Sequence, residues 1–471
     1  MVHQMVIRTG GLLEKHYARF ILSCIIWLGS GCSSKSESDK NVLPDQRIQK
    51  ASTEEALMTF ETKQLFWSSV RKTLFHNDRF YSLVFAKEGP LAKIQSFLFV
   101  HSKGRVEIPF SQLPPEFTLI DFDITSDGRL VQLGYREIEG SDNEFGFPLK
   151  ELSIFIDSKK AFVFFDSKQN LAVRYDKNAT PSRSQHFDKN KTYFLTSSPM
   201  TAFAKLRATN QEIYVSAVGT FGFKIFRFDY SGHEVSQAEI LPQTAFNTVL
   251  VDKEAPFFEV TDSCVIAAIT TTRDDVPIFQ KHLGVRLNWT VPEYQVILQS
   301  FNLSMLERTT QLIKGTANFF VSGIQTGRDE VAVFGSSGGA GDRKALVASF
   351  NFELTELYRA EFSITKESNL YAAAFLKGRL LVAGSTGSLQ VDSGSVVEAA
   401  DAFVSSISSN GAITTLARFG TDRHDRVTSL LSVGDEVFLS GQQNGPITHT
   451  ADANPQLGYQ EWFLGRLKQP N

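Results

Sequence analysis

The chain has 471 residues, of which 42% are hydrophobic and 21% charged, with 40 Phe and a net charge of −3 at pH 7. This composition is that of a folded chain with a large core, and it excludes a disordered one. The mildly acidic balance argues against nucleic acid as the main partner. The three cysteines, Cys24, Cys32 and Cys264, are too few for a disulfide framework or a cysteine-ligated metal site.

The N-terminal segment has the features of an export signal. Arg8, Lys15 and Arg19 precede the mostly apolar residues 20–31, which narrow to small residues just before Cys32. A helix of that length spans only about 18 Å, short of the roughly 30 Å of a bilayer core. A stable membrane-spanning helix is therefore not expected.

The end of this segment resembles a bacterial lipoprotein signal, in which a lipobox precedes the cysteine that is lipidated and becomes the mature N-terminus. Ser30 and Gly31 suit the two positions before Cys32, whereas Gly29 stands where leucine is usual. The resemblance implies that residues 1–31 are a signal peptide and that Cys32 carries fatty acyl chains such as palmitate. These would anchor the protein in a bacterial cell envelope, with the outer membrane favoured. An ordinary secretory signal and a retained anchor are the alternatives.

The next segment, residues 32–62, is predicted to comprise the lipidated cysteine and a flexible tether. Its beginning, Ser33 to Lys40, is polar throughout, and a short helix is expected at Glu54–Thr59. Residues 63–471 then form the folded domain. From about residue 70, short runs rich in Val, Ile, Phe and Tyr alternate with turns of Gly, Asn, Asp and Ser, which predicts an all-β structure.

One motif recurs seven times in this domain, with 49 to 73 residues between copies. It consists of an apolar strand, a turn and a second strand, and the first turn residues are His101, Asp157, Asp229, Asn302, Asn351, Ser408 and Lys468. A further hairpin precedes each copy, at residues 73–85, 121–135, 204–218, 257–269, 320–335, 373–385 and 429–441. Two hairpins per unit make four antiparallel strands, the blade of a β-propeller.

The seventh unit ends with the chain and lacks its outer strand, and residues 63–71 are predicted to supply that strand and so close the ring. The repeats resemble those of bacterial β-propellers of the "DAFVxxxxxxG…VFLSG" type, with residues 400–411 as the clearest copy. The resemblance implies a seven-bladed β-propeller. A pair of β-sandwiches or a β-solenoid is the alternative, although a solenoid would have stricter periods and sandwiches would not give seven matched hairpin pairs.

Few segments suggest chemistry. Residues 420–426 contain Asp422, His424 and Asp425, but we interpret them as a solvated turn because the sequence does not specify a ligand geometry. The Gly-rich residues 335–344 lack the Lys-Ser/Thr pair of a phosphate loop and are followed by a strand, so a flexible loop is predicted there and at 384–395.

Two longer insertions, residues 140–150 and 270–295, fall between the second and third strands of their blades. The second insertion provides the candidate interface residues, which are Arg273, Phe279, Arg286, Trp289 and Tyr294. Packing of these aromatic side chains against their own blade is the alternative. The adjacent Asp274 and Asp275 point apart in an extended loop, which disfavours joint acid/base work. Cys264 is predicted to be a small core residue.

The sequence therefore predicts a cell-envelope lipoprotein that acts as a non-enzymatic, monomeric binding scaffold for an envelope protein or surface ligand. No catalytic residue, cofactor or metal is assigned, and no nucleic-acid partner is expected. The alternative is an envelope hydrolase or lyase that acts on polysaccharide or peptide at the central channel. Carboxylates, His or Arg that converge at one mouth of the channel would favour the enzyme, and an exposed aromatic patch would favour the scaffold.

Overall fold

A computed structural model provides the fold, and it describes the chain in separate stretches. The described residues are 57–61, 67–87, 93–102, 105–107, 113–137, 150–157, 159–165, 203–219, 222–242, 255–272, 294–313, 317–339, 342–365, 367–392, 395–420, 425–443 and 461–468. All of them belong to the unit Ile48–Asn471, one of two compact units in the chain. The predicted signal peptide, Cys32 and the tract Ser33 to Lys40 lie outside the described residues.

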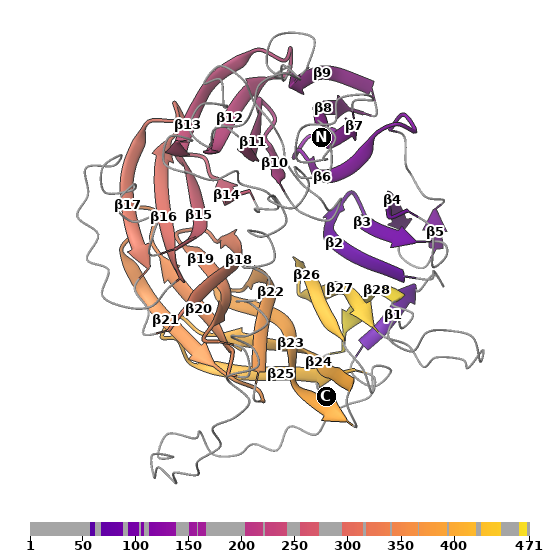
Figure 1. The fold of residues 1–471 in the computed structure, drawn as a ribbon, viewed down its shortest axis with the longest axis vertical. Coiled ribbons are helices and arrows are strands. Elements are labelled where there is room, and N and C mark those ends of the chain that lie inside the picture. The colour runs from indigo at the N-terminus through magenta and orange to yellow at the C-terminus, as the bar shows by residue number, and fades with distance from the viewer. Residues whose placement is uncertain are drawn as a thin grey trace, which may run out of the picture. The chain divides into compact units, whose positions relative to one another are not determined.

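The described strands form seven antiparallel sheets of four strands each, arranged in a ring (Figure 1). The predicted all-β, seven-bladed β-propeller is thus confirmed. The blades are numbered in chain order, and the innermost strands, which border the centre of the ring, are β2, β6, β10, β14, β18, β22 and β26.

The strands of each blade follow one another from the centre outwards. Blades 1 to 3 consist of β2 (Trp67–His76), β3 (Arg79–Lys87), β4 (Gln95–Ser102), β5 (Arg105–Glu107); β6 (Thr118–Ile124), β7 (Leu130–Glu137), β8 (Lys150–Ile156), β9 (Lys159–Phe165); and β10 (Ala204–Ala208), β11 (Glu212–Gly219), β12 (Gly222–Asp229), β13 (Glu234–Pro242). Blades 4 to 6 consist of β14 (Phe257–Val260), β15 (Cys264–Thr272), β16 (Tyr294–Asn302), β17 (Glu307–Ile313); β18 (Phe319–Thr326), β19 (Val331–Ser337), β20 (Lys344–Phe350), β21 (Glu356–Phe362); and β22 (Glu367–Leu376), β23 (Arg379–Asp392), β24 (Ser395–Ile407), β25 (Ile413–Phe419).

Blade 7 closes the ring with strands from both ends of the domain. It contains β26 (Arg426–Val433), β27 (Glu436–Gln443), β28 (Glu461–Leu467) and, outermost, β1 (Leu57–Glu61). Leu57 pairs with Leu467 and Met58 with Arg466 in antiparallel register. An N-terminal closing strand was therefore predicted correctly, but the residues assigned to it were wrong.

Residues 63–71 do not close the ring, because most of them belong to β2, the innermost strand of blade 1. β2 is ten residues long and pairs with β3 along its whole length, from Trp67 opposite Lys87 to His76 opposite Arg79. The strand that closes the ring is instead β1, from the preceding stretch Leu57–Glu61. The helix expected at Glu54–Thr59 is also wrong over its last three residues, which start β1.

Recurring glycines in the repeats have a steric cause. In blades 5, 6 and 7, the pairing between the innermost strand and the second strand has a register shift, and the two backbones lie very close together there. A Cβ on the facing glycine would collide with a backbone carbonyl oxygen of the inner strand, namely Phe320 O for Gly335, Asn369 O for Gly384 and Arg426 O for Gly441. Only glycine permits that approach.

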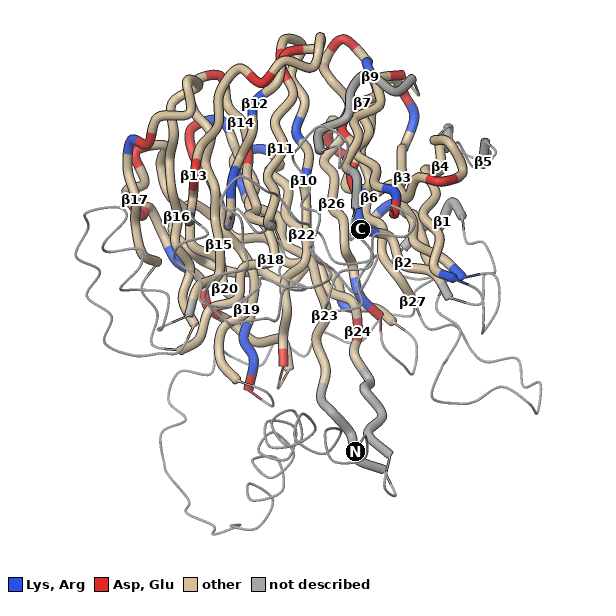
Figure 2. The backbone as a smooth tube through the Cα atoms, turned by 45° about the horizontal axis from the view of Figure 1, so that its top comes forward, with Lys and Arg blue, Asp and Glu red and all other residues tan. Residues whose placement is uncertain are grey.

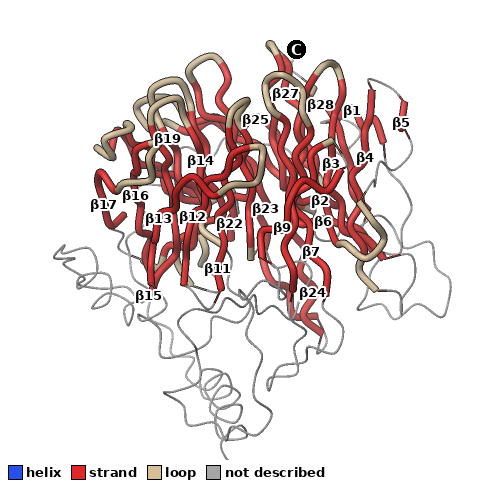
Figure 3. Tube along the Cα trace, turned by 90° about the horizontal axis from the view of Figure 1, so that it is seen from above, coloured by secondary structure: helices blue, strands red, loops and turns tan. Residues whose placement is uncertain are grey.

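Short hairpin turns connect strands at one end of the blades, as seen at the top of Figure 3. The second and third strands of each blade are joined at the other end. The loop predicted at 335–344 does connect β19 and β20, but residues 335–337 belong to β19 and residue 344 to β20. The loop predicted at 384–395 is wrong, because β23 and β24 continue as a paired hairpin as far as Asp392 opposite Ser395.

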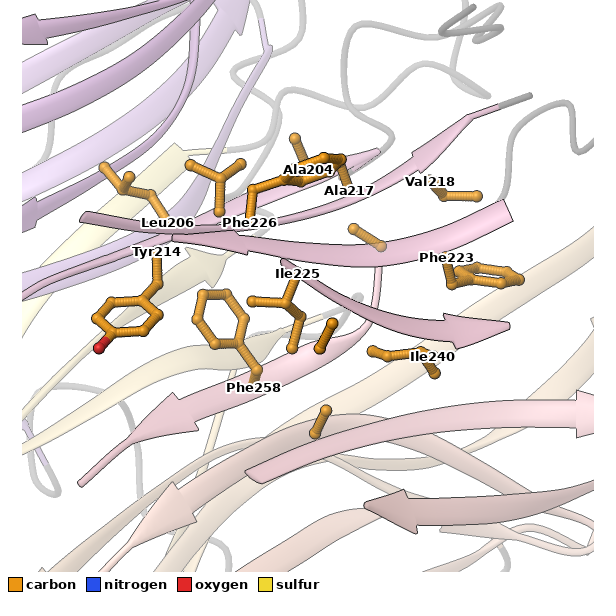
Figure 4. Close-up of a cluster of buried hydrophobic side chains, with 14 of the residues drawn as sticks. Ala204, Leu206, Tyr214, Ala217, Val218, Phe223, Ile225, Phe226, Ile240 and Phe258 are labelled. Carbon is orange, nitrogen blue, oxygen red and sulfur yellow. The ribbon is translucent and has the colours of Figure 1, made fainter. Parts of the chain in front are cut away.

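The core lies between adjacent blades. Its largest cluster joins blades 2, 3 and 4, and Figure 4 shows Tyr214 and Ile225 of blade 3 beside Phe258 of β14. Full burial of each such side chain contributes about 1.5–3 kcal/mol. Cys264 is fully buried in the neighbouring cluster between blades 4 and 5, which confirms its prediction as a core residue.

The seam between blades 7 and 1 is aromatic. Trp462 of β28 is fully buried, and its ring centroid lies 5.3 Å from that of Phe99 and 5.3 Å from that of His101, both in β4. The Trp462 backbone N–H donates to Ser68 Oγ at 2.9 Å. The His101 imidazole, 3% exposed, is thus enclosed at the seam between blades 7 and 1.

We expect His101 to make the fold sensitive to acid. Burial lowers its pKa to about 4, against 6.5 in an exposed state. The unfolded chain takes up the proton first, so the free energy of unfolding should decline as the pH falls from 6.5 towards 4, by about 3 kcal/mol in total.

Urea unfolding at about pH 7, 5.5 and 4.5 measures this decline. In His101→Phe the decline should be smaller by about that amount, whereas the exposed His233→Asn variant should retain it. An unchanged pH dependence in His101→Phe would contradict the assignment.

Candidate functional site

The innermost strands of all seven blades enclose one central cavity of about 460 Å³. Its lining comes from β2, β6, β10, β14, β18, β22 and β26, together with Phe85 of β3 and Phe334 of β19. A volume of this size falls within the range of small-molecule sites. The cavity is thus a candidate ligand site at the axis of the propeller, which we call the central cavity.

The lining of the central cavity is rich in cations. Among the described residues, it includes five basic side chains, Arg71, Lys72, Lys205, Arg207 and Arg426, and two acidic ones, Asp121 and Glu259. The whole chain is acidic, and several acidic residues lie in the turns at the top of Figure 2. The described charged residues of the lining are thus mostly basic, whereas the chain as a whole is acidic.

Three of these charged residues occupy the same register position on adjacent inner strands. Lys72, Asp121 and Lys205 lie on blades 1, 2 and 3, and their cross-strand partners are Leu83, Leu133 and Ser216. Because the blades repeat one geometry, these positions form a single level of the channel. The charges alternate there as positive, negative, positive.

Asp121 connects three blades. Its Oδ1 accepts hydrogen bonds from Lys72 Nζ at 3.1 Å and from the Phe122 N–H at 2.8 Å, and its Oδ2 accepts one from the Leu206 N–H at 2.7 Å. Burial alone would raise the pKa of Asp121, but Lys72, then Arg207, and the Leu206 N–H outweigh it, so the pKa lies below its usual value. Asp121 is therefore a buried, ionised carboxylate.

Glu259 is held by Arg207 at the next level of the channel. Arg207 Nε lies 3.1 Å from each oxygen of the Glu259 carboxylate, and Nη2 lies 2.6 Å from Oε1. Burial opposes the charge of Arg207, yet Glu259 keeps the pKa of the guanidinium above its usual value. Both carboxylates of the cavity are thus committed to ion pairs.

Two further cations of the lining contact neutral groups. Lys205 Nζ donates to the Ala255 carbonyl oxygen at 2.5 Å and lies 3.2 Å from the ring centroid of Phe257. Arg426 Nη2 donates to Gln442 Oε1 at 3.0 Å, and its guanidinium carbon lies 5.6 Å from the ring centroid of Tyr371. Cation–π contacts and carbonyl oxygens stabilise a positive charge.

The wall formed by blades 5, 6 and 7 is different. Apart from Arg426, the residues of this wall that the structure describes are small, apolar or neutral. They are Ser322, Gly323, Ile324, Gln325, Tyr371, Ala372, Ala373, Thr428, Ser429, Leu430 and Leu431. The central cavity is consequently two-sided, with a charged wall from blades 1 to 4 and a weakly polar wall opposite.

Most of the interface residues predicted from the sequence cannot be placed. Arg273, Phe279, Arg286 and Trp289 lie outside the described residues. Tyr294 starts β16, and its ring packs 5.0 Å from that of Phe320, while its N–H donates to Asn318 Oδ1. Tyr294 thus contacts blade 5 and is not part of the cavity lining.

The turn at residues 420–426 is described only in part. Asp422 and His424 lie outside the described residues, as do Asp274 and Asp275 of the long insertion. Asp425, expected in a solvated turn, is instead 1% exposed, and its N–H donates to the Ala400 carbonyl oxygen at 2.6 Å. Within the described stretches, no three His, Cys, Asp or Glu side chains gather as metal ligands.

Sequence reasoning missed the charges of the central cavity. They are spread over five short strands from Arg71 to Arg426, so no local motif reports them. A usable signal was the basic residues inside the first hairpin of three units, in "SSVRKTL", "AKLRA" and the start of "RVTSLL".

In the part of the chain that the structure describes, no helix has the length and apolar character to cross a membrane.

No protein-family model matches the chain, and no curated protein matches it. Among solved structures, it is similar to the phage phi92 endosialidase (8% identity, 88% of this chain and 70% of that chain, TM-score 0.45). It is also similar to the β-propeller domain of the Trilobed protease from Pyrococcus furiosus (8% identity, 86% and 95%, TM-score 0.41) and to Drosophila Semaphorin 2a (7% identity, 82% and 74%, TM-score 0.44). Likeness at this level concerns the fold alone.

Removing the charge of Asp121 should destabilise the propeller. Asp121→Asn leaves Lys72 without its buried partner, and such a loss costs about 3 kcal/mol. Urea unfolding at neutral pH measures it. Asp435→Asn, which removes the exposed ion pair with Lys377, is the matched control and should cost little. Equal effects of the two substitutions would contradict a structural role for the channel pair.

Proposed function

We propose that this chain is a bacterial cell-envelope lipoprotein whose propeller is a non-enzymatic binding scaffold. Acyl chains on Cys32 would hold it at the membrane, with the outer membrane favoured. The partner would be an envelope protein or a surface ligand, bound by a monomer through a propeller face and its insert loops. The observation that carries a binding role is the commitment of both cavity carboxylates, Asp121 and Glu259, to ion pairs.

This observation favours binding over the alternative of a hydrolase or lyase at the central channel. General acid–base catalysis needs a group that exchanges its proton near the working pH. The pKa of Asp121 is lowered, and three donors occupy its oxygens. Both Glu259 oxygens face the Arg207 guanidinium. Among the described residues of the cavity, the carboxylates therefore serve the architecture.

The proposed scaffold would use the insert loops as part of its binding surface. Strands β7 and β15 end, and β8 and β16 begin, at the end of their blades opposite the short hairpin turns. The connection between β15 and β16 contains the proposed contact residues Arg273, Phe279, Arg286 and Trp289, with Tyr294 at its end. Loops on a rigid scaffold present such aromatic and Arg anchors effectively.

The anchor is tested with Cys32→Ala. Cells that express the full chain are labelled with a tagged palmitate, and membranes are separated from soluble fractions. The wild type should incorporate label and sediment with membranes, and the variant should lose both properties because no thiol remains to be acylated. Label incorporation and sedimentation that persist in Cys32→Ala would overturn the lipoprotein assignment.

The binding role is tested by affinity capture of the full-length protein from detergent-solubilised envelope after crosslinking. The wild type should retain a specific partner. The amount of partner recovered with Trp289→Ala should be about tenfold lower, as expected for the loss of one hot-spot residue. Lys377→Ala, in a turn at the opposite end, is the matched control. Equal recovery with all three proteins, or no partner together with turnover of an envelope glycan, would overturn the scaffold role.

A further inference from the structure

We infer that the outer rim of blades 3 to 5 docks a basic, amphipathic segment of a partner protein. The outer rim lies at the end of the ring that carries the short hairpin turns, where the outermost strands of these blades begin. It consists of three exposed aliphatic residues and their acidic neighbours in the chain, namely Val235, Leu306, Leu357, Glu234, Glu307 and Glu356. The strands that the insert loops connect end on the opposite side, so this surface goes beyond the proposed function.

The outer rim exposes large aliphatic side chains at a repeated position. Among the residues that the structure describes, four large hydrophobic side chains are exposed, and each lies on the outermost strand of its blade or directly before it. They are Val235 of β13 (48% exposed), Leu306 before β17 (65%), Leu357 of β21 (52%) and Leu416 of β25 (36%). Figure 1 shows that these four strands follow one another along the outside of the ring. Single exposed hydrophobic residues are common on protein surfaces, but a row on consecutive blades indicates a contact surface.

A β-bulge in the outermost strand accompanies this exposure in three of the blades. The pairing of the third strand with the outermost one passes over Val235 in blade 3, Leu357 in blade 5 and Leu416 in blade 6. In blade 4 it passes over Arg308, two residues after Leu306. A bulged residue is left out of the ladder, and the bulge re-aims its side chain. The repeated backbone geometry thus exposes these side chains instead of packing them into the blade.

The charge of the outer rim selects a basic partner. The outer hairpin turns of blades 3, 4 and 5, at residues 229–236, 302–309 and 351–359, are described without a gap. They contain five acidic and two basic residues, which are Asp229, Glu234, Glu307, Glu353, Glu356, Arg308 and Arg359. Even with Arg359 paired to Glu356 at 2.7 Å, these turns retain an excess of negative charge. Complementary charge on a partner speeds its association and fixes its orientation.

The same charges disfavour other occupants of the outer rim. The inner hairpin turns of blades 4 and 5 add the exposed residues Asp262, Arg328 and Asp329, which do not reverse the balance. An anionic membrane surface or a nucleic acid would be repelled. A second copy of this chain that presented the same surface would bring like charges together, which is unfavourable.

Apolar and acidic groups occur side by side along the outer rim. In each of its three blades the exposed aliphatic residue is next to an exposed glutamate in the chain, as Glu234 and Val235, Leu306 and Glu307, and Glu356 and Leu357. A fitting partner therefore needs aliphatic side chains together with Lys or Arg on one face. Blade 6 does not share this chemistry, because Leu416 is exposed but residues 408–415 contain no charged residue.

The test is fluorescence anisotropy with labelled synthetic peptides on the full-length protein in a non-ionic detergent. The probes are a peptide of alternating Leu and Lys, the same peptide with Ser in place of Leu, and the same peptide with Glu in place of Lys. Detergent without protein gives the blank. At about 20 mM NaCl the Leu/Lys peptide should bind with a Kd of about 100 µM or lower, about tenfold more tightly than the other two, and the affinity should fall at about 150 mM NaCl.

Variants locate the binding. Leu306→Ser combined with Leu357→Ser should weaken binding of the Leu/Lys peptide about tenfold, because the apolar contact is lost. Glu307→Gln combined with Glu353→Gln should weaken it several-fold and reduce its dependence on salt. Thermal melting checks that each variant is folded, and the glutamate variant alone decides the test if the leucine variant unfolds.

Two exposed positions outside the outer rim provide matched controls. Leu416→Ser removes an exposed leucine from the outermost strand of blade 6, and Asp435→Asn removes an exposed carboxylate from a turn of blade 7. Both variants should bind the Leu/Lys peptide like the wild type. If either control weakens binding as much as the rim variants do, the peptide is not bound at the outer rim and the inference is wrong.

The remaining outcomes also decide the inference. Unchanged binding in both rim variants, or equal binding of the Ser/Lys or Leu/Glu peptide, would overturn it. A wild-type dimer in sedimentation velocity that the leucine variant abolishes would identify a second copy as the occupant and exclude the basic partner. Capture through Trp289 concerns the opposite end of the ring, so its failure leaves the peptide result intact, and failure of peptide binding leaves capture intact.

Discussion

The rest of the structure depends on pairing the two ends of the domain in one sheet. β1 adds to β28, so that a strand from the beginning of the domain completes the last blade. A ring of sheets without this pair would have an open seam and exposed strand edges. The aromatic contact of Trp462 with Phe99 and His101 secures the next seam, and only a closed ring keeps seven inner strands around one cavity.

Closure also explains why charged residues can be buried at the axis. Inner strands of adjacent blades are not hydrogen-bonded as one sheet, so their backbone N–H groups need other partners. Asp121 and Asp123 of β6 accept hydrogen bonds from the N–H groups of Leu206 and Ala208 on β10. At the seam between blades 7 and 1, Thr428 donates to the Val70 carbonyl oxygen. Asp121 and Thr428 thus connect blades and also line the cavity.

The sequence predicted the fold closely because the information is local. Each hairpin has its own alternation and turn, and Asn77 and Asp78, both with positive φ, make the tight turn that "FHNDRF" suggests. Two neighbouring apolar stretches, 57–61 and 63–71, were candidates for the closing strand. Residues 67–76 pair with β3 along its whole length, so the earlier stretch closes the ring. The candidate site was not predictable in this way, since Lys72, Asp121 and Lys205 are separated by long stretches of chain.

By itself, the sequence determined the class of fold, the number of blades and the existence of a closing strand, because strand period and turn chemistry act over a few residues. Only the tertiary structure decided which strand closes the ring and which side chains meet at its axis. Arg207 and Glu259 belong to different blades, and their contact exists because the repeated geometry puts equivalent positions of neighbouring blades side by side. A cavity built from seven strands is a property of the ring, and no single repeat contains it.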